Sequence, residues 1–286
     1  MKVEEIITAR IIEKLEAGTV PWHRPWSGAD MPKNLISKKE YRGINVFILS
    51  AMGFGSPYWI SFKQAQELGG NVRKGEKGCP VVFWKWLESA ETDENGQQRK
   101  ASHPILRYYT VFNVLQIDGI DETKIPALAQ KYNERERITV CENVVDNMPK
   151  RPEIIFDYAG AFFRPATDTV NMPKIETFDS SEEYYSTLFH ELTHSTGHET
   201  RLNRRGSDVP RHFGDKEYSK EELIAEMGAA FLCGHCQIEN KTIDNSAAYI
   251  ANWLRKFRDD AKMVIMAGGA AQKAVDFILG RQVSEA

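Results

Sequence analysis

The sequence lacks any apolar run long enough to cross a membrane, for which about 18 or more consecutive apolar residues are needed. Its first residues, Met1–Glu5, are acidic where a secretory signal peptide has a basic and then an apolar region. We therefore expect no membrane contact, and we predict that the protein works in the cytoplasm.

Cysteine is also scarce. Four cysteines in 286 residues do not make a disulfide framework. Cys233 and Cys236 have the C-x-x-C spacing of redox proteins, in which the motif opens a helix after a strand. Here the motif closes a predicted helix, with Gly234 as its expected C-cap. We interpret it as a chance spacing in a reducing compartment.

The most informative stretch is an H-E-x-x-H motif formed by His190, Glu191 and His194. Residues four apart lie on one face of a helix, so the two histidines can bind one metal ion. Glu191 lies roughly 100° around the helix, a position from which it can reach a water molecule on that ion. Zinc lowers the pKa of such a water, and Glu191 is the predicted base that takes its proton.

The context of the motif favours a helix. The segment Ser180–Glu183 has the polar and acidic character of a helix start, and Leu188, Phe189 and Leu192 give an apolar side. The alternative is an ordinary amphipathic helix that happens to carry two histidines. A metzincin would need a third histidine at position 200, where this sequence has Thr200, so that class is excluded.

A catalytic zinc site needs a third protein ligand, and a second predicted helix at 218–232 offers one. Glu222 and Glu226 are four residues apart on this helix and therefore share a face. This pair resembles the arrangement of gluzincin peptidases, in which one glutamate binds zinc and an acidic residue one turn later orients a ligand histidine. On that resemblance we assign Glu222 as the third ligand of a zinc ion, or of another divalent metal such as Mn²⁺. Glu226 is assigned to the second shell, where it would orient a ligand histidine. Swapped roles, or two glutamates that only solvate the helix, remain open.

Basic and aromatic residues gather in the N-terminal third. Residues 24–85 include ten basic and four acidic residues, and five of the six tryptophans lie in the first 86 residues. Aromatic rings that stack on bases, together with cations that neutralise phosphates, are typical of single-strand nucleic-acid binding. The candidate DNA-binding residues are Trp22, Trp26, Tyr41, Arg42, Tyr58, Trp59, Lys63, Arg73, Lys74 and Lys77. For each tryptophan, packing in a core is the competing interpretation.

The periodicity predicts an α+β protein with two domains. An N-terminal domain at 1–118 contains a helix at 3–16 and strands at 80–86 and 105–114, joined by a hairpin loop around Asn95-Gly96. A linker is predicted at 119–133 and a second domain at 134–286. In that domain the extended segment 168–173 is expected to be an edge strand beside the H-E-x-x-H helix, open to an extended peptide.

Several of these stretches resemble one family, the antirestriction proteins of the ArdC type. The similar segments in the N-terminal half are Leu15–Trp26, Tyr41–Asn45, Trp59–Ala65 and Val72–Gly78. The similar segments in the C-terminal half are His190–His198, Arg201-Leu202 and Tyr249–Leu254. The resemblance implies a single-stranded-DNA-binding domain followed by a zincin-like metallopeptidase domain. Related modules are fused to plasmid primases, whereas two domains are expected to fill these 286 residues.

Three functions fit the sequence. The resemblance implies an antirestriction protein that binds single-stranded DNA and protects incoming plasmid or phage DNA from host restriction. The alternative is a DNA-bound metalloprotease that removes proteins from DNA, so that a restriction enzyme or another DNA-bound host protein is its substrate. A third possibility is a binding protein with a structural metal site. Glu191 argues against it, because a structural site needs no base.

Overall fold

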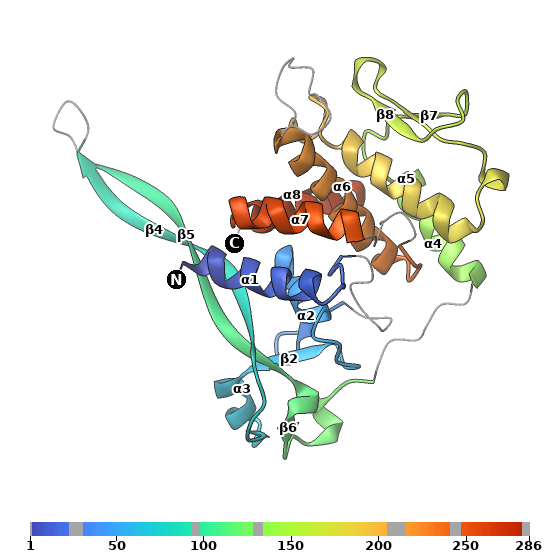
Figure 1. Ribbon diagram of the computed structural model, residues 1–286. Coiled ribbons are helices and arrows are strands. Elements are labelled where there is room, and N and C mark those ends of the chain that lie inside the picture. Colours follow the sequence, from blue (N-terminus) through green and yellow to red (C-terminus); the bar gives the residue numbers. More distant parts are fainter. Residues whose placement is uncertain are drawn as a thin grey trace.

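A computed structural model describes residues 2–22, 31–92, 98–127, 134–204, 216–240 and 247–281. It confirms the predicted α+β class and the two-part layout, with α1, two shorter helices and a four-stranded sheet in the N-terminal half and mainly helices with a small sheet in the C-terminal half (Figure 1). Within the described residues, every helix is too short or too polar to span a bilayer.

The elements follow the predicted order closely. The helices are α1 (Val3–Glu16), α2 (Ile44–Ser50), α3 (Phe62–Glu67), α4 (Glu134–Asp146), α5 (Ser181–Ser195), α6 (Lys216–His235), α7 (Ala247–Asp259) and α8 (Met263–Ile278). The strands are β1 (Lys33–Asn34), β2 (Tyr58–Ser61), β3 (Asn71–Val72), β4 (Cys79–Thr92), β5 (Gln98–Asn113), β6 (Ile117–Asp118), β7 (Glu153–Ile155), β8 (Phe162–Arg164) and β9 (Thr169–Asn171). Short 3-10 turns are η1 (Val114–Gln116), η2 (Glu122–Lys124), η3 (Pro165–Thr167) and η4 (Ile175–Thr177).

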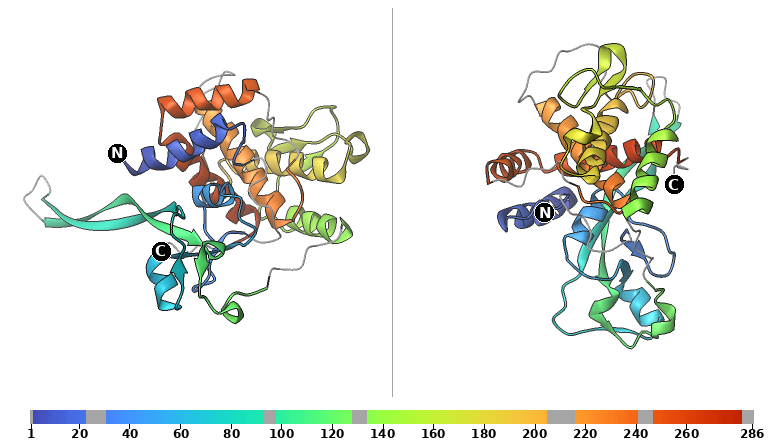
Figure 2. Two further views of the ribbon diagram at one scale, coloured as in Figure 1. Left: turned by 60° about the horizontal axis from the view of Figure 1, so that its bottom comes forward. Right: turned by 90° about the vertical axis from the view of Figure 1, so that its right-hand side faces the viewer.

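The N-terminal sheet has the strand order β1-β2-β5-β4. Strands β4 and β5 pair antiparallel from Cys79 opposite Val111 out to Thr92 opposite Gln98. They are longer than predicted, because the pairing continues through the polar stretch that the sequence suggested as a loop. The two strands therefore extend beyond the helices as a two-stranded arm (Figures 1 and 2). The tip around Asn95-Gly96 lies outside the described residues.

The C-terminal half carries a small sheet in the order β7-β9-β8. Strand β9 lies in its centre, parallel to β7 and antiparallel to β8. This corrects the expectation that 168–173 forms an open edge. Both sides of β9 are already hydrogen-bonded, so the edges of this sheet belong to β7 and β8.

The main hydrophobic core is shared by the two halves. Ile7, Ile11 and Leu15 of α1 are buried in the same cluster as Trp253 and Phe257 of α7. Helix α1 lies beside α7 and α8, far from it in sequence (Figures 1 and 2). A second, smaller core joins β2, α3 and η1 within the N-terminal half. An isolated fragment 1–118 would expose the apolar face of α1, so binding experiments need the full chain.

One close approach between the halves depends on glycine. Gly43, which precedes α2, has a φ of 57°, in the region that favours glycine. A side chain on Gly268 of α8 would place its Cβ 2.9 Å from the backbone nitrogen of Ile44. The start of α2 can therefore lie directly against α8.

The C-x-x-C segment differs from its expected geometry. Helix α6 continues through Gly234 to His235, so Gly234 is not the C-cap, and the positive φ of 58° falls on Gln237. Cys233 and Cys236 are both buried. Burial raises the pKa of the Cys233 thiol well above its usual value, which disfavours the thiolate that redox chemistry requires.

Candidate metal centre

Helix α5 carries the H-E-x-x-H motif, and backbone groups at both ends of this helix have hydrogen-bond partners outside it. At its start, the side chain of Ser180 accepts a hydrogen bond from the backbone nitrogen of Glu183 at 3.2 Å. The carboxylate of Glu183 in turn accepts from the backbone nitrogen of Asp179 at 2.9 Å. These contacts give partners to donors that a helix start otherwise leaves without them. Acidic residues at this end also interact favourably with the positive end of the helix dipole.

Two arginines hold the other end of α5. Arg201 Nε donates to the carbonyl of Ser195 at 2.7 Å, and Arg204 Nη2 donates to the carbonyl of Thr193 at 3.0 Å. Carbonyls in the last turn have no partner within the helix, and positive charge is favourable there. The turn that contains His194 is therefore fixed from outside the helix.

Helix α6 packs tightly against α5 at Gly228. A Cβ on Gly228 would lie 2.4 Å from Cγ2 of Thr193, closer than real contacts allow. Thr193 is next to His194, and Gly228 is less than two turns after Glu222. This close approach sets the distance between the helix that offers the histidines and the helix that offers the glutamates.

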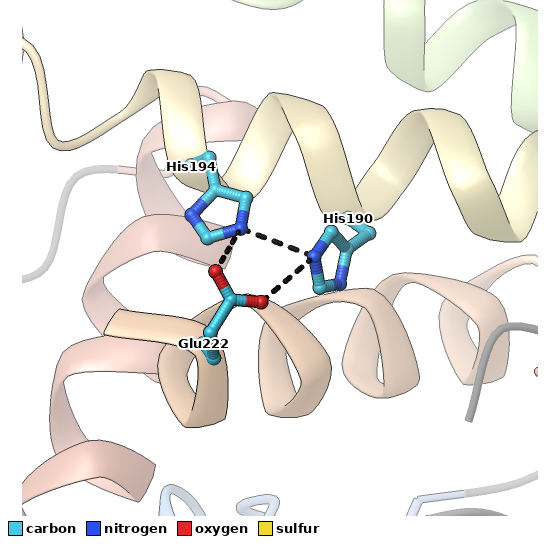
Figure 3. A group of neighbouring side chains, drawn as sticks. All are labelled: His190, His194 and Glu222. Atoms are coloured by element: carbon cyan, nitrogen blue, oxygen red, sulfur yellow. Dashed lines mark hydrogen bonds and ion pairs between the residues drawn. The ribbon is translucent and has the colours of Figure 1, made fainter. Parts of the chain in front are cut away.

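The structure brings the three predicted ligands together (Figure 3). The Nε2 atoms of His190 and His194 are 3.1 Å apart, and both face the carboxylate of Glu222. Glu222 Oε1 lies 3.5 Å from His194 Nε2, and Glu222 Oε2 lies 3.7 Å from His190 Nε2. Ligand atoms bound to one zinc ion at about 2.0–2.2 Å are roughly 3.1–3.7 Å apart for bond angles of roughly 95–125°. Two imidazoles and a carboxylate at these separations therefore fit a divalent ion.

The charges at the site also favour a cation. Burial acts to lower the pKa of His194, but its hydrogen bonds to Glu221 and Glu222 and the charge of Glu191 outweigh burial and raise it to about 9. Burial acts to raise the pKa of Glu222, yet the hydrogen bonds to His190 and His194 keep it well below its usual value. Negative charge is thus concentrated around the histidines, where a positive ion is stabilised.

Glu191, the predicted base, is buried, with 9 % of its surface exposed. Its charge acts on the adjacent ligand His194, as the raised pKa of His194 shows. Glu191 is absent from the group of three residues whose ligand atoms converge. The predicted role of Glu191 as a base requires a carboxylate that is not itself a metal ligand, which agrees with its absence from that group.

The carboxylate beside a ligand histidine is Glu221, not Glu226. Glu221 Oε1 lies 3.6 Å from Nδ1 of His194, the nitrogen that faces away from the ligand group. The same oxygen accepts a hydrogen bond from Arg204 Nη2 at 2.9 Å. Burial acts to raise the pKa of Glu221, but its contacts with His194 and Arg204 outweigh burial and lower it to about 2. Because helix positions 221 and 222 point about 100° apart, one residue can reach the outer nitrogen of His194 while the next faces the ligand atoms.

Glu226 has other partners, which corrects its assignment. Its Oε2 accepts a hydrogen bond from Trp22 Nε1 at 3.0 Å and another from the hydroxyl of Tyr249. Burial raises the pKa of Glu226, although these two donors oppose the rise. Glu226 therefore anchors the N-terminal segment and α7 to α6.

The third histidine of the segment, His198, lies outside the ligand group. Its Nδ1 is 2.9 Å from the hydroxyl of Thr200 and 3.9 Å from the carboxylate of Asp168. Among the described residues, the group that could hold a metal ion thus has three members, and three protein ligands would leave room at an ion for a further ligand.

Most aromatic residues predicted to bind DNA are buried. Trp22 is fully buried, and Trp59, Tyr58 and Tyr41 are 2 %, 4 % and 8 % exposed. A ring enclosed by protein has no free face on which a base can stack. These four residues are thus core residues, which corrects their assignment to the DNA surface. Trp26 lies outside the described residues.

The predicted cations divide into two groups. Arg42 forms an ion pair with the buried Asp276 of α8, and Arg73 is bound to Glu76, Asp118 and the carbonyl of Leu115. The remaining three, Lys63, Lys74 and Lys77, are exposed. Lys63 forms an ion pair with Glu67 at 3.8 Å, but both side chains are exposed, so this pair contributes little to the fold. The second group can therefore offer its charge to a phosphate at little cost in stability.

Sequence reasoning missed a set of exposed aromatics on the arm. Phe83, Trp84, Trp86 and Tyr108 are 43 %, 49 %, 57 % and 46 % exposed. The signal was present as the alternation Trp84-Lys85-Trp86, since residues two apart in a strand share a face. The sequence predicts only an ordinary strand for this stretch, because no local pattern indicates that the arm leaves the body of the protein.

Comparisons with known proteins agree with the two-part layout. The model of the N-terminal domain of anti-restriction factor ArdC matches residues 1–112, and a zincin-like metallopeptidase model matches residues 143–271. The uncharacterized protein y4eC of Sinorhizobium fredii is 33 % identical, over 98 % of this chain and 92 % of that protein. Two DNA primases TraC of Escherichia coli are 35 % and 36 % identical over 98 % of this chain, which spans only 28 % and 20 % of their length.

Solved structures are similar along nearly the whole chain. The metal-free crystal structure of the antirestriction ArdC protein from plasmid R388 has a TM-score of 0.76 and 37 % sequence identity, covering 99 % of this chain and all of that chain. The Mn(II)-bound structure of the same protein has the same TM-score and identity, covering 98 % of each chain.

Proposed function

Because the chain belongs to the ArdC family of antirestriction proteins, we propose that it binds single-stranded DNA and shields incoming plasmid or phage DNA from host restriction enzymes. The basic excess in residues 24–85 supports this proposal, since cations in that region can neutralise phosphates. Entering DNA and restriction enzymes meet in the cytoplasm, which is where we place the activity.

We further propose that the metal centre is a gluzincin-like metallopeptidase site. The convergence of His190, His194 and Glu222 is the observation that carries this proposal. Either Zn²⁺ or Mn²⁺ fits a set of two imidazoles and one carboxylate. When bound, such an ion supplies a Lewis acid that polarises a carbonyl and lowers the pKa of a water molecule.

The residues around the metal centre would have separate roles in peptide hydrolysis. Glu191 accepts the proton of the attacking water and passes it to the leaving amine. Glu221, fixed by Arg204, holds His194 through Nδ1, so that its Nε2 stays aimed at the ligand position. Burial of Glu191 limits competing solvent around the base.

The second candidate function is a DNA-bound protease that removes proteins from DNA. It is favoured by the contact between Trp22 and Glu226, which ties the N-terminal half to the helix that carries Glu222. In that case the substrate is a restriction enzyme or another protein on the DNA.

A restriction-protection assay during DNA entry separates the two functions. It compares the wild type, Glu191→Ala and the double variant His190→Ala/His194→Ala, with metal content and circular dichroism measured for each. Glu191→Ala keeps all three ligands, so it should remain folded and metal-loaded while any hydrolysis fails. We expect it still to protect DNA, because binding alone can shield a strand. Loss of protection in this folded, metal-loaded variant would instead favour proteolysis of a host protein.

A further inference from the structure

The arm formed by β4 and β5 leaves the body of the protein at Val82. Val81 and Val82 are buried, whereas Phe83, Trp84 and Lys85 are all exposed. Phe83 and Trp84 point to opposite faces, so each face of the strand pair carries an exposed aromatic side chain, although Leu106 opposite Trp84 is still buried. The arm projects past α1 in Figure 1 and in the left view of Figure 2.

Large aromatic side chains cover the first part of this arm. The register places Trp84, Trp86 and Tyr108 on one face, because Val82 lies opposite Tyr108 and alternate residues share a face. Phe83 lies on the other face, directly opposite Arg107. An exposed aromatic surface of this kind is costly in water unless it binds a partner.

The charge at the base of the arm is mainly positive, and Glu88 is the first acidic residue after Trp86. The segments 77–87 and 103–112 contain Lys77, Lys85, His103 and Arg107 and no aspartate or glutamate. Lys85 and Arg107 are exposed on the same face as Phe83. A surface that combines open aromatic faces with cations complements bases and phosphates, whereas an apolar protein surface would gain nothing from the cations.

The spacing of the rings favours a single strand over a duplex. Residues two apart in a strand, such as Trp84 and Trp86, are separated by roughly 6.6–6.8 Å along the chain. Stacked bases in a duplex are about 3.4 Å apart. Bases that stack on successive rings must therefore be separated from one another, which only an unpaired strand allows.

We propose that the base of the arm, with Phe83, Trp84, Lys85, Trp86, Arg107 and Tyr108, is the surface on which this protein binds single-stranded nucleic acid. This inference rests on the proposed function and replaces the buried aromatics as the stacking residues. Bases stack on the rings of Trp84, Trp86 and Tyr108 on one face of the arm. Lys85 and Arg107, which share the other face with Phe83, neutralise phosphates of a strand that passes around the edge of the arm.

The test measures fluorescence anisotropy of a labelled oligothymidylate with the full-length protein. Trp84→Ala/Trp86→Ala should raise Kd about tenfold or more, because each stacked base contributes about 1–3 kcal/mol. The salt dependence of Kd for this tryptophan variant should remain that of the wild type. Lys85→Ala/Arg107→Ala should lower the slope of log K against log salt by about 1, since fewer counterions are released. Oligouridylate in parallel distinguishes DNA from RNA as the preferred strand.

Two controls keep the test specific. Phe156→Ala removes an aromatic residue that is 51 % exposed on the metallopeptidase half, and it should leave Kd unchanged. Trp84→Phe/Trp86→Phe keeps an aromatic face at both positions and should retain most of the affinity. All these side chains are exposed, so the thermal unfolding of the variants should match that of the wild type.

The possible failures can be told apart. If the wild type binds no single-stranded DNA, the proposed function itself fails. If the wild type binds single-stranded DNA and both arm variants bind it with the same affinity, the arm proposal is wrong and the proposed function stands. Tighter binding of duplex than of single strands would contradict the stacking argument. If the tryptophan variants convert a dimer into a monomer in sedimentation while Kd is unchanged, the arm is a self-association surface and the proposal is wrong.

Discussion

Trp22 Nε1 donates a hydrogen bond to Glu226 Oε2 at 3.0 Å, although 204 positions separate the two residues in the chain. Glu226 lies one turn after the proposed metal ligand Glu222 on α6. The ring of Trp22 also packs edge-on against Trp253 and Phe257 of α7. The N-terminal segment is therefore part of the framework that supports the metal centre, and the two halves share a side-chain network.

The first prediction concerns this hydrogen bond. Trp22→Phe keeps an aromatic ring in the core but removes one donor from a buried carboxylate. It should lower the free energy of unfolding by about 1–3 kcal/mol, the usual cost of a lost partner at a buried polar group. Urea denaturation of metal-free protein measures this. The same substitution at the exposed Trp84 should change stability by less than about 0.5 kcal/mol.

A double-mutant cycle sharpens that prediction. Trp22 Nε1 and the Tyr249 hydroxyl donate to the same oxygen of Glu226. The losses in Trp22→Phe and Tyr249→Phe should therefore not add, with a coupling of at least about 0.5 kcal/mol. Strict additivity would mean that the two donors act independently.

The second prediction follows from the raised pKa of Glu226. Burial raises this pKa above the ordinary value of 4.5, so the folded protein favours the neutral carboxyl. A group with a raised pKa in the folded state stabilises the fold fully below its unfolded pKa and loses that contribution as pH rises. Wild-type stability should thus fall relative to that of Glu226→Gln as pH increases upward from about 4.5, the ordinary value. Denaturation of metal-free protein at several pH values tests this, and a difference that is constant with pH would refute it.

The third prediction distinguishes Glu221 from Glu226. Glu221→Gln should weaken metal binding about 10–100-fold, because the carboxylate that orients His194 is lost. Glu226→Gln is the matched control, since it makes the same change on the same helix but contacts Trp22 and Tyr249. Calorimetric titration with Zn²⁺ and Mn²⁺ measures both affinities. A larger loss in Glu226→Gln would restore the assignment made from the sequence.

The fourth prediction concerns the ligands themselves. Elemental analysis should show clearly reduced metal in Glu222→Ala and in His194→Ala, because each variant lacks one of three converging ligands. Glu191→Ala should retain the metal. Full occupancy in Glu222→Ala would remove this residue from the ligand set.

The last prediction tests the contact between α5 and α6. Gly228→Ala should destabilise the protein by about 1–3 kcal/mol and weaken metal binding, because its Cβ would collide with Thr193 and displace α6 from the histidines. Gly269→Ala is the control. It lies in α8 with open space around it, so it should be neutral or stabilise the helix by up to about 1 kcal/mol. Equal behaviour of the two variants would show that the approach at Gly228 does not position the site.

The sequence by itself determined the features that depend on local spacing. The bounds of α1 follow from apolar residues at helical intervals and match the predicted 3–16. The pairing of His190 with His194 follows from the spacing of residues four apart on a helix. These conclusions need no knowledge of what packs against each element.

Only the tertiary structure decided which face of each helix and strand is buried and which partner each side chain contacts. Glu221, Glu222 and Glu226 are equally good ligand candidates by type, and it is the rotation of α6 against α5, set at Gly228, that turns Glu222 to the histidines and Glu226 to Trp22. Likewise, Trp59 and Trp84 look alike in the sequence. Trp59 belongs to the shared core, whereas Trp84 is exposed on the arm that extends beyond it. Burial depends on contacts between segments distant in the chain, and no local pattern of residues contains that information.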